Sequence, residues 1–305
     1  MALQKEIWKS DIIEGLFKDN AFAMRAVNAD SFVLAGKVVH IPVAGTAATI
    51  KKNLTSFPQT AVNRADSEIT YNLDTMYILP RQIQDIEKYE LSYAKRESVV
   101  GEDRKQLVQE CMNSLLYRWG PAAAHVVETS GSDSAVDLLA SATGTRKLFD
   151  KAQFKTIAKS FANTDQAGRK TALLTANHYY QFLESLSDAE KTDVGRVADM
   201  ASGIVARYMG FDIMMRSSVL RYRKVSTVWT LVDEQDDAFA AGTGDSAASL
   251  FWVDSGVERA VGETVVFDDN GNPLYYGDVF SAYQRLGGRI RRASSVKAVV
   301  EAIGA

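Results

Sequence analysis

A long polar stretch between two strand-like segments constrains the fold of this chain more than any other feature. Residues 44–68 contain few large apolar side chains, so a compact core has little to bury there. A stretch of this length is uncommon inside a compact domain and usually marks a functional loop. The preceding segment, 38–43, is β-branched and holds a proline, and alternation of apolar and polar side chains returns from Ile69 onward. The sequence therefore predicts a protruding two-stranded loop, in which one strand leaves at 38–43 and another returns from Ile69.

The clearest helical pattern lies in residues 99–119. Leu107, Cys111 and Leu115 form one apolar row at helical spacing, and a Gly-Pro pair follows the segment and predicts its end. Because Cys111 lies in this row, we expect a buried, unreactive thiol. As the only cysteine of the chain, it also excludes an intrachain disulfide and the paired-cysteine zinc sites.

A second apolar stripe runs along the first residues of the chain. Trp8, Ile12 and Leu16 follow one another at spacings of four within residues 5–17, which predicts an amphipathic helix. Such a helix either docks on the core of its own chain or reaches across to a neighbouring subunit. Both interpretations stay open on the sequence alone.

The remaining segments predict a mixed α+β protein without βαβ alternation or internal repeats. Residues 150–163 and 170–186 predict helices, and 187–190 predict the start of another. The predicted strands lie at 225–232, 249–253, 265–267 and 274–276. The last two flank a turn-forming run at 268–273 and so predict a hairpin.

The chain carries no recognisable catalytic, cofactor-binding or metal-binding motif. It has no phosphate-binding loop and no complete dinucleotide fingerprint, and the turn at 268–273 does not fit a calcium loop. His40, His125 and His178 are far apart and lack the spacing of zinc ligands. We therefore assign no catalytic residue, no cofactor and no metal.

Charge and hydropathy limit the classes of partner. The 305 residues are 46% hydrophobic and carry 35 basic against 38 acidic side chains, a formal net charge of −3. This near-neutral charge argues against a protein whose main function is to bind the phosphate backbone of nucleic acids. No window predicts a membrane helix, and charged residues interrupt the first twenty positions, so we expect neither a signal peptide nor a membrane partner.

Basic residues nevertheless recur in two later segments. They are Arg207, Arg216, Arg221, Arg223 and Lys224, and then Arg285, Arg289, Arg291 and Arg292. On strands such residues face a polyanion or pair with acids of a neighbouring molecule, and the sequence does not choose between the two.

The order of these segments resembles that of a known family, the tailed-phage major capsid proteins with the Hong Kong ninety-seven type fold. The segments that carry the resemblance are the opening helix with 36–42, the polar excursion returning through 69–80, residues 83–89 leading into the long helix, the glycine-aromatic turn within 206–218, and the closing run 277–292. The resemblance covers nearly the whole chain in order, while each motif by itself is weak.

The resemblance implies a domain organisation and a function. The implied parts are an N-terminal arm at 1–37, an extended loop at 38–79, a peripheral domain at 80–143 and 262–305 with a spine helix at 99–119, and an axial domain at 144–261. The implied function is a non-enzymatic shell protein that assembles with itself into hexamers and pentamers around double-stranded DNA. Portal and other head proteins are implied partners, with only weak, non-specific contact to the packaged DNA. The implied location is the virion, after synthesis in the bacterial cytoplasm.

For such a shell we expect inter-subunit contacts at two places. They are the stripe of Trp8, Ile12 and Leu16, and the polar loop, where Lys51, Lys52 and Arg64 would meet an acidic surface. Two alternatives remain open. One is a nanocompartment shell of the same fold that encloses enzymes, and the other is an α+β enzyme whose site is assembled from dispersed residues.

Overall fold

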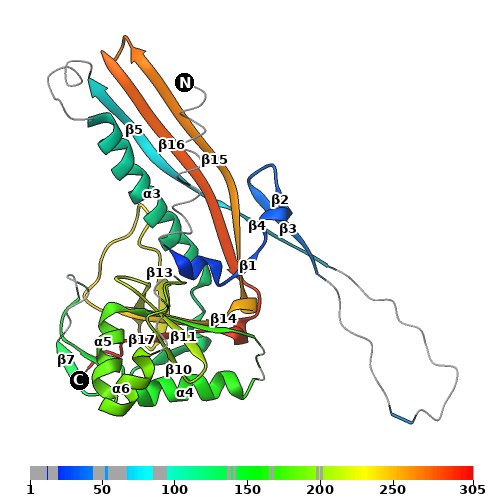
Figure 1. Ribbon diagram of the computed structural model, residues 1–305, viewed down its shortest axis with the longest axis vertical. Helices are drawn as coiled ribbons and strands as arrows, with labels where there is room; N and C mark the ends of the chain where they lie inside the picture. Colours follow the sequence, from blue (N-terminus) through cyan, green and yellow to red (C-terminus); the bar gives the residue numbers. More distant parts are fainter. Residues whose placement is uncertain are drawn as a thin grey trace.

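Two sheets of different size organise the part of the chain that the structure describes. The computed structural model describes residues 12, 20–43, 52–53, 67–84, 95–135, 139, 142–164, 166, 168–196, 199 and 202–304. Figure 1 shows a long, narrow sheet with one helix beside it, above a rounder body that holds the larger sheet and the shorter helices. The predicted α+β class is confirmed.

The narrow sheet has four strands in the order β1-β15-β16-β5, and helix α3 packs against it. Its elements are β1 (Val27–Asn28), β15 (Val257–Asn272), β16 (Gly277–Ile290), β5 (Asp74–Gln84) and α3 (Lys95–Trp119). Along β16, Phe280, Ala282 and Leu286 are buried in the same core cluster as the apolar row of α3. Because successive side chains of a strand point to opposite faces, the other face of this sheet points away from α3.

The larger sheet has eight strands. Its main path runs β10-β11-β9-β14-β12-β13, and β17 pairs with β14 and β6. The strands are β6 (Val126–Glu128), β9 (Lys170–Thr175), β10 (Ala206–Tyr208), β11 (Phe211–Arg216), β12 (Leu220–Val225), β13 (Val228–Val232), β14 (Asp245–Val253) and β17 (Val296–Val300). All nine residues of β14 are buried, since both faces of the sheet are covered.

Helices cover one face of the larger sheet around a cluster of aromatic rings. They are α4 (Lys151–Ala162), α5 (Ala176–Ser185) and α6 (Asp188–Gly195). Asp150 begins α4 because its side chain accepts hydrogen bonds from the N–H groups of Ala152 and Gln153. The buried phenylalanines of the cluster are Phe149, Phe154, Phe161, Phe182, Phe211 and Phe251. The opposite face of the sheet packs with α3 in the other large core cluster.

Smaller elements complete the described chain. A three-stranded sheet holds β2 (Val33–Leu34), β3 (Val38–Val43) and β4 (Ser67–Asn72), and β7 (Asp133–Ala135) pairs with β8 (Thr145–Lys147). The short 3-10 helices are η1 (Ala21–Met24), η2 (Asp30–Phe32), η3 (Ala123–His125), η5 (Asp254–Gly256) and η6 (Ala293–Ser295). β3 and β4 are antiparallel, so the predicted pairing of the strands flanking residues 44–68 is confirmed.

The long helix and the buried cysteine are confirmed. The helix ends at Trp119 as predicted and begins four residues earlier than predicted, at Lys95. Cys111 is fully buried, and burial raises the pKa of its thiol to about 12. A thiol with so high a pKa is protonated at neutral pH and unreactive.

The helix predicted over 170–186 is wrong in its first third. Residues 170–175 form strand β9, and the helix begins at Ala176. β9 lies between β11 and β14, and Leu173 and Leu174 are buried in different core clusters on its two faces. A strand covered on both faces lacks alternation, so its apolar run has no period-two pattern to distinguish it from a helix.

Three predicted strands have different limits in the structure. Of the strand predicted at 225–232, only 228–232 form a strand, β13, because the segment begins at the last residue of β12 and turns at Ser226, where φ is +57°. The alternation through 69–77 breaks at Leu73, because β4 pairs with β3 whereas β5 pairs with β16. The predicted final hairpin exists, but β15 continues to Asn272 and the return strand starts only at Gly277.

One strand pairs across the predicted domain boundaries. The implied peripheral domain takes in 80–143 and 262–305, yet its β17 pairs with β14 of the implied axial domain, and β6 joins the same sheet through β17. The last strand of the chain thus returns to the body that holds 144–261. The implied boundaries themselves stay a prediction.

Candidate functional site

Three side chains of the kinds found in hydrolase triads meet inside the larger sheet. Ser249 Oγ lies 2.7 Å from His178 Nδ1, and His178 Nε2 lies 3.4 Å from Glu301 Oε1. Ser249 Oγ also accepts a hydrogen bond from the N–H of Thr175 at 3.0 Å. His178 and Ser249 are 0% exposed and Glu301 is 4% exposed, so a substrate has no approach to the hydroxyl. The contacts join α5 and the end of the chain to β14.

A groove of about 500 Å³ lies between β5 and α3. Two of the carboxylates that line it have partners within the chain. Asp103 pairs with Arg81 Nε at 3.2 Å, and Glu110 Oε2 accepts a hydrogen bond from Gln235 Nε2 at 2.8 Å. Within the described ranges, no three His, Cys, Asp or Glu side chains are grouped to hold a metal ion. None of the helices described there is long and apolar enough to cross a membrane.

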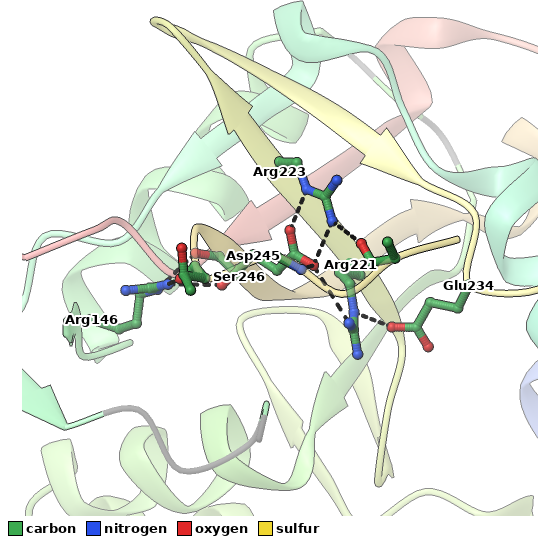
Figure 2. A network of polar contacts seen from close by, with 9 residues as sticks. Arg146, Arg221, Arg223, Glu234, Asp245 and Ser246 are labelled. Carbon is green, nitrogen blue, oxygen red and sulfur yellow. Dashed lines mark hydrogen bonds and ion pairs between the residues drawn. The ribbon is translucent and has the colours of Figure 1, made fainter. Parts of the chain in front are cut away.

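A buried carboxylate organises the polar network shown in Figure 2. Asp245 begins β14, its side chain is 0% exposed, and its Oδ1 accepts from Arg223 Nε at 2.6 Å. Its Oδ2 accepts from Arg223 Nη2 at 3.0 Å and from the N–H of Gly242 at 2.9 Å, with Arg221 Nη1 at 3.5 Å. Burial by itself raises the pKa of Asp245, but the bonds from Arg223 and Gly242 and the two positive charges lower it overall.

The polar network around Asp245 holds the loop between β13 and β14 in place. Arg221 also pairs with Glu234, and its guanidinium lies 5.1 Å from the ring centroid of Phe239. On the other side of the network, Arg146 donates to Ser246 Oγ at 2.9 Å and to the Asp245 carbonyl oxygen at 2.8 Å. Both ends of the loop are therefore held by side chains of the sheet beneath it.

The open face of the narrow sheet carries an aromatic row. Tyr77 of β5 and Tyr283 of β16 are directly paired, with ring centroids 5.8 Å apart, and Phe267 of β15 lies 6.1 Å from Tyr283. Tyr77 is 67% exposed and the neighbouring Leu79 is 78% exposed. Exposed apolar patches of this kind are typical of sites of association. We refer to Tyr77, Leu79, Phe267 and Tyr283 as the aromatic face.

Sequence reasoning missed the aromatic face, although part of its signal was visible. The alternation after Ile69 places Tyr77 on one face of a strand. That Tyr283 and Phe267 stand beside it depends on the pairing of three strands far apart in the sequence. No local pattern contains that information.

The predicted inter-subunit residues fall mostly outside the described part of the chain. Trp8, Leu16, Lys51 and Arg64 lie outside the described residues. Lys52 is described and exposed. Ile12 is helical, 1% exposed and part of the chain's own core cluster, as expected for a stripe docked on its own chain. A role for the stripe across a subunit boundary stays a prediction.

Most of the recurrent basic residues pair with acids of the same chain. The pairs are Arg207 with Asp212, Arg221 and Arg223 with Asp245, Lys224 with Glu128, Arg285 with Glu263, and Arg289 and Arg291 with Glu258. Arg216 instead lies 5.7 Å from the ring centroid of Phe22. Much of the basic charge is thus balanced within the chain itself.

Comparison with known proteins places this architecture among viral shells. No family model and no curated protein matches the sequence. Among solved structures, the capsid of Ralstonia phage GP4 is similar at a TM-score of 0.62 and 10% identity, covering 92% of this chain and 88% of that one. The capsid of cyanophage P-SCSP1u is similar at 0.61 and 13% identity, with 92% and 87% covered.

A virus-like particle from Pyrococcus furiosus is also similar, at a lower TM-score of 0.53 and 9% identity, with 96% and 98% of the two chains covered. In each comparison the similarity extends over about nine-tenths of both chains. It therefore includes the narrow sheet with α3 as well as the larger sheet with its helices. The chain has the Hong Kong ninety-seven type fold of tailed-phage capsid proteins.

Proposed function

We propose that this chain is the major capsid protein of a tailed phage, a structural protein that assembles into the hexamers and pentamers of an icosahedral shell around double-stranded DNA. The observation that carries the proposal is the near-complete, two-way coverage between this chain and phage capsid structures. The exposed aromatic face supports it, because a subunit that buries such a surface on assembly has a physical reason to associate.

The buried polar contacts support the same role. The triad-like side chains and the Asp245 network hold elements together and offer no open site to a substrate. A shell subunit distributes its binding energy over several contacts with neighbours and needs a rigid body from which to present them. The implied arm, extended loop, peripheral domain and axial domain are the parts that would make these contacts.

Lys51, Lys52 and Arg64 are the loop residues that we propose to meet acidic surface on a neighbouring subunit. Trp8, Ile12 and Leu16 form the stripe that we propose to contribute at a subunit boundary, even though Ile12 also packs on its own core. Portal and other head proteins would be further partners, the virion would be the location, and the bacterial cytoplasm would be the place of synthesis.

Negative-stain electron microscopy of the purified protein, together with its sedimentation profile, tests the proposal. Closed shells, tubes or separate pentamers and hexamers are the expected result. A uniform small oligomer that never assembles, even at high concentration or with a co-expressed scaffold, contradicts it and favours the enzyme alternative.

A nanocompartment shell is the second candidate, and the similarity to the virus-like particle favours it less than the phage capsids favour the first. The two differ in what the shell encloses. Shells that co-purify with a stoichiometric protein cargo would indicate the nanocompartment. Shells that are empty or contain DNA would indicate the phage capsid.

A further inference from the structure

Two exposed arginines are held in place by one buried carboxylate at an end of the larger sheet. Asp212 of β11 is 5% exposed, and its two carboxylate oxygens pair with the Nε atoms of Arg169 and Arg207. The side chains of Arg169 and Arg207 are 45% and 46% exposed. Each arginine contacts Asp212 through Nε, and within the described part of the chain no hydrogen bond engages the Nη groups of either one.

More arginines stand at the same end of the sheet. The N–H of Asp254 bonds to the carbonyl oxygen of Arg169 at 3.0 Å, and the N–H of Arg291 bonds to that of Gly256 at 2.8 Å. The turn η5 therefore joins Arg169 to Arg291, and Arg292 follows directly along the chain. We refer to Arg169, Arg207, Arg291 and Arg292 as the arginine edge.

The length of the arginine edge follows from the number of neighbouring strands that it crosses. Arg207 lies on β10, Arg169 directly precedes β9, and Arg291 and Arg292 precede β17. The strands run β10-β11-β9-β14-β17, which is four steps of about 4.8 Å, or about 19 Å. That length spans several successive phosphates of a nucleic-acid strand.

Charge at the arginine edge is one-sided at the surface. Its four arginines are all exposed. Within the described ranges, the acids that pair with them are Asp212 and Glu258, which are both buried, and the half-buried Asp254 lies near Arg169. Buried carboxylates thus orient the guanidinium groups of Arg169, Arg207 and Arg291. Planar guanidinium forks held in a fixed geometry are the usual protein ligands for phosphate.

We propose that the arginine edge binds the phosphate backbone of nucleic acid, and so forms the contact between this shell protein and its packaged DNA. The inference rests on the proposed function for the identity of the DNA. The contact is local and sequence-independent, since backbone contacts carry no sequence information. The chain's net charge of −3 keeps the contact weak away from this edge.

Fluorescence anisotropy with a labelled DNA duplex of about 20 base pairs tests the proposal over about 50–200 mM salt. The main variant is Arg169→Gln/Arg207→Gln/Asp212→Asn, which removes both forks without leaving a buried charge unpaired. We expect the variant to bind the duplex about tenfold more weakly at low salt. The slope of log affinity against log salt concentration should also be shallower, by the release of about two counterions. Lys155→Gln on α4, the helix that packs on one face of the sheet, changes the net charge equally and is expected to leave the affinity and its salt dependence unchanged.

A second variant guards against a folding defect in the first. Arg291→Gln/Arg292→Gln leaves the Asp212 site intact and Glu258 paired with Arg289, and it is also expected to weaken binding. Lys155→Gln/Lys159→Gln is its charge-matched control. Binding that both arginine variants leave unchanged overturns the proposal, as does an equal loss in the lysine controls. If polyglutamate displaces the duplex when both are present at equal charge concentration, the nucleic-acid proposal is overturned in favour of an acidic protein partner.

The same samples separate this inference from the proposed function. Shell formation, measured by microscopy, reports on the proposed function alone. Wild-type shells with unchanged DNA binding in the arginine variants overturn only the arginine edge. Wild-type protein that binds DNA through the edge but never assembles overturns only the shell.

Discussion

The indole N–H of Trp119, at the end of α3, donates a 2.9 Å hydrogen bond to the backbone carbonyl oxygen of Glu258, near the start of β15. Trp119 is fully buried, and its ring centroid lies 5.6 Å from that of Trp252 in β14. One side chain thus contacts the long helix, the narrow sheet and the larger sheet. This contact joins the two sheets through one buried side chain, which leads to the first prediction.

Gly288→Ala is expected to destabilise the subunit. A Cβ at residue 288 would lie 2.6 Å from the Glu258 carbonyl oxygen and 2.8 Å from Trp119 Nε1. Shifting backbone atoms to relieve this crowding is energetically costly, so we expect the free energy of unfolding to fall by about 1–3 kcal/mol. Urea unfolding of unassembled subunits measures it. Gly101→Ala in α3 is the matched control, because nothing lies within 4 Å of its Cβ position and alanine favours helix there. Equal effects of the two substitutions would contradict the crowding argument.

Asp245→Asn is expected to lower stability at neutral pH and to flatten the acid limb of the stability profile. Burial opposes ionisation of Asp245, but the bonds from Arg223 and Gly242 prevail and lower its pKa in the folded state. A lowered folded-state pKa stabilises above the unfolded value of about 4, and this contribution is lost as the pH falls through the folded-state pKa. Removing the charge should cost about 3 kcal/mol at pH 7.

Unfolding by urea at pH 7 and at several pH values below about 4 checks the acid prediction, since the difference in stability between the two proteins should shrink as the pH falls. Glu234→Gln serves as its control, because Glu234 is 38% exposed and pairs with Arg221 at the surface of the same network. A difference between wild type and Asp245→Asn that does not shrink as the pH falls would mean that the loss is steric and not electrostatic.

Cys111 is expected to resist alkylation in the folded subunit. Its thiol is fully buried, and burial raises its pKa to about 12, so almost no thiolate exists at pH 8. Incubation with iodoacetamide should label the thiol only after unfolding in guanidinium chloride, as followed by intact mass. Stoichiometric labelling of the native protein within minutes would show that α3 opens readily.

Deletion of residues 46–64 is expected to leave a folded subunit that does not assemble. β3 and β4 pair on either side of the deleted segment, and the core clusters contain none of its residues among those described. Circular dichroism and sedimentation velocity distinguish folding from assembly. Normal shells from the deleted protein would remove the loop from the assembly contacts. The variant Lys51→Glu/Lys52→Glu tests the narrower claim that the positive charges of this loop contact an acidic surface of a neighbouring subunit.

The apolar stripe predicted within residues 5–17 allows an effect on assembly to be separated from an effect on stability. Trp8→Ala and Leu16→Ala should reduce the yield of shells more than they lower the subunit's Tm, if the stripe lies at a subunit boundary. Ile12→Ala is the internal comparison, because Ile12 is buried in the chain's own core and should cost about 2–5 kcal/mol of stability. A larger drop in Tm than in shell yield for all three would assign the whole stripe to the core.

Local patterns were sufficient where one face of an element is buried. The row of Leu107, Cys111 and Leu115 predicts α3 because a helix with one apolar side repeats at its own period. The turn residues at 268–273 likewise predict a hairpin, and only its limits differ. The strand at 170–175 was missed because both of its faces are covered, which erases the alternation on which the prediction depends.

By itself, the sequence determined the α+β class, the long helix with its buried thiol, the paired strands around residues 44–68 and, through the order of its segments, the resemblance to phage capsid proteins. Only the tertiary structure brought Tyr77 beside Tyr283, Arg207 and Arg169 onto Asp212, and the last strand of the chain back into the larger sheet. The physical reason is the distance along the sequence over which each kind of interaction acts. Helical period and turn chemistry act over a few residues, whereas these contacts join strands that only the folded sheets place side by side.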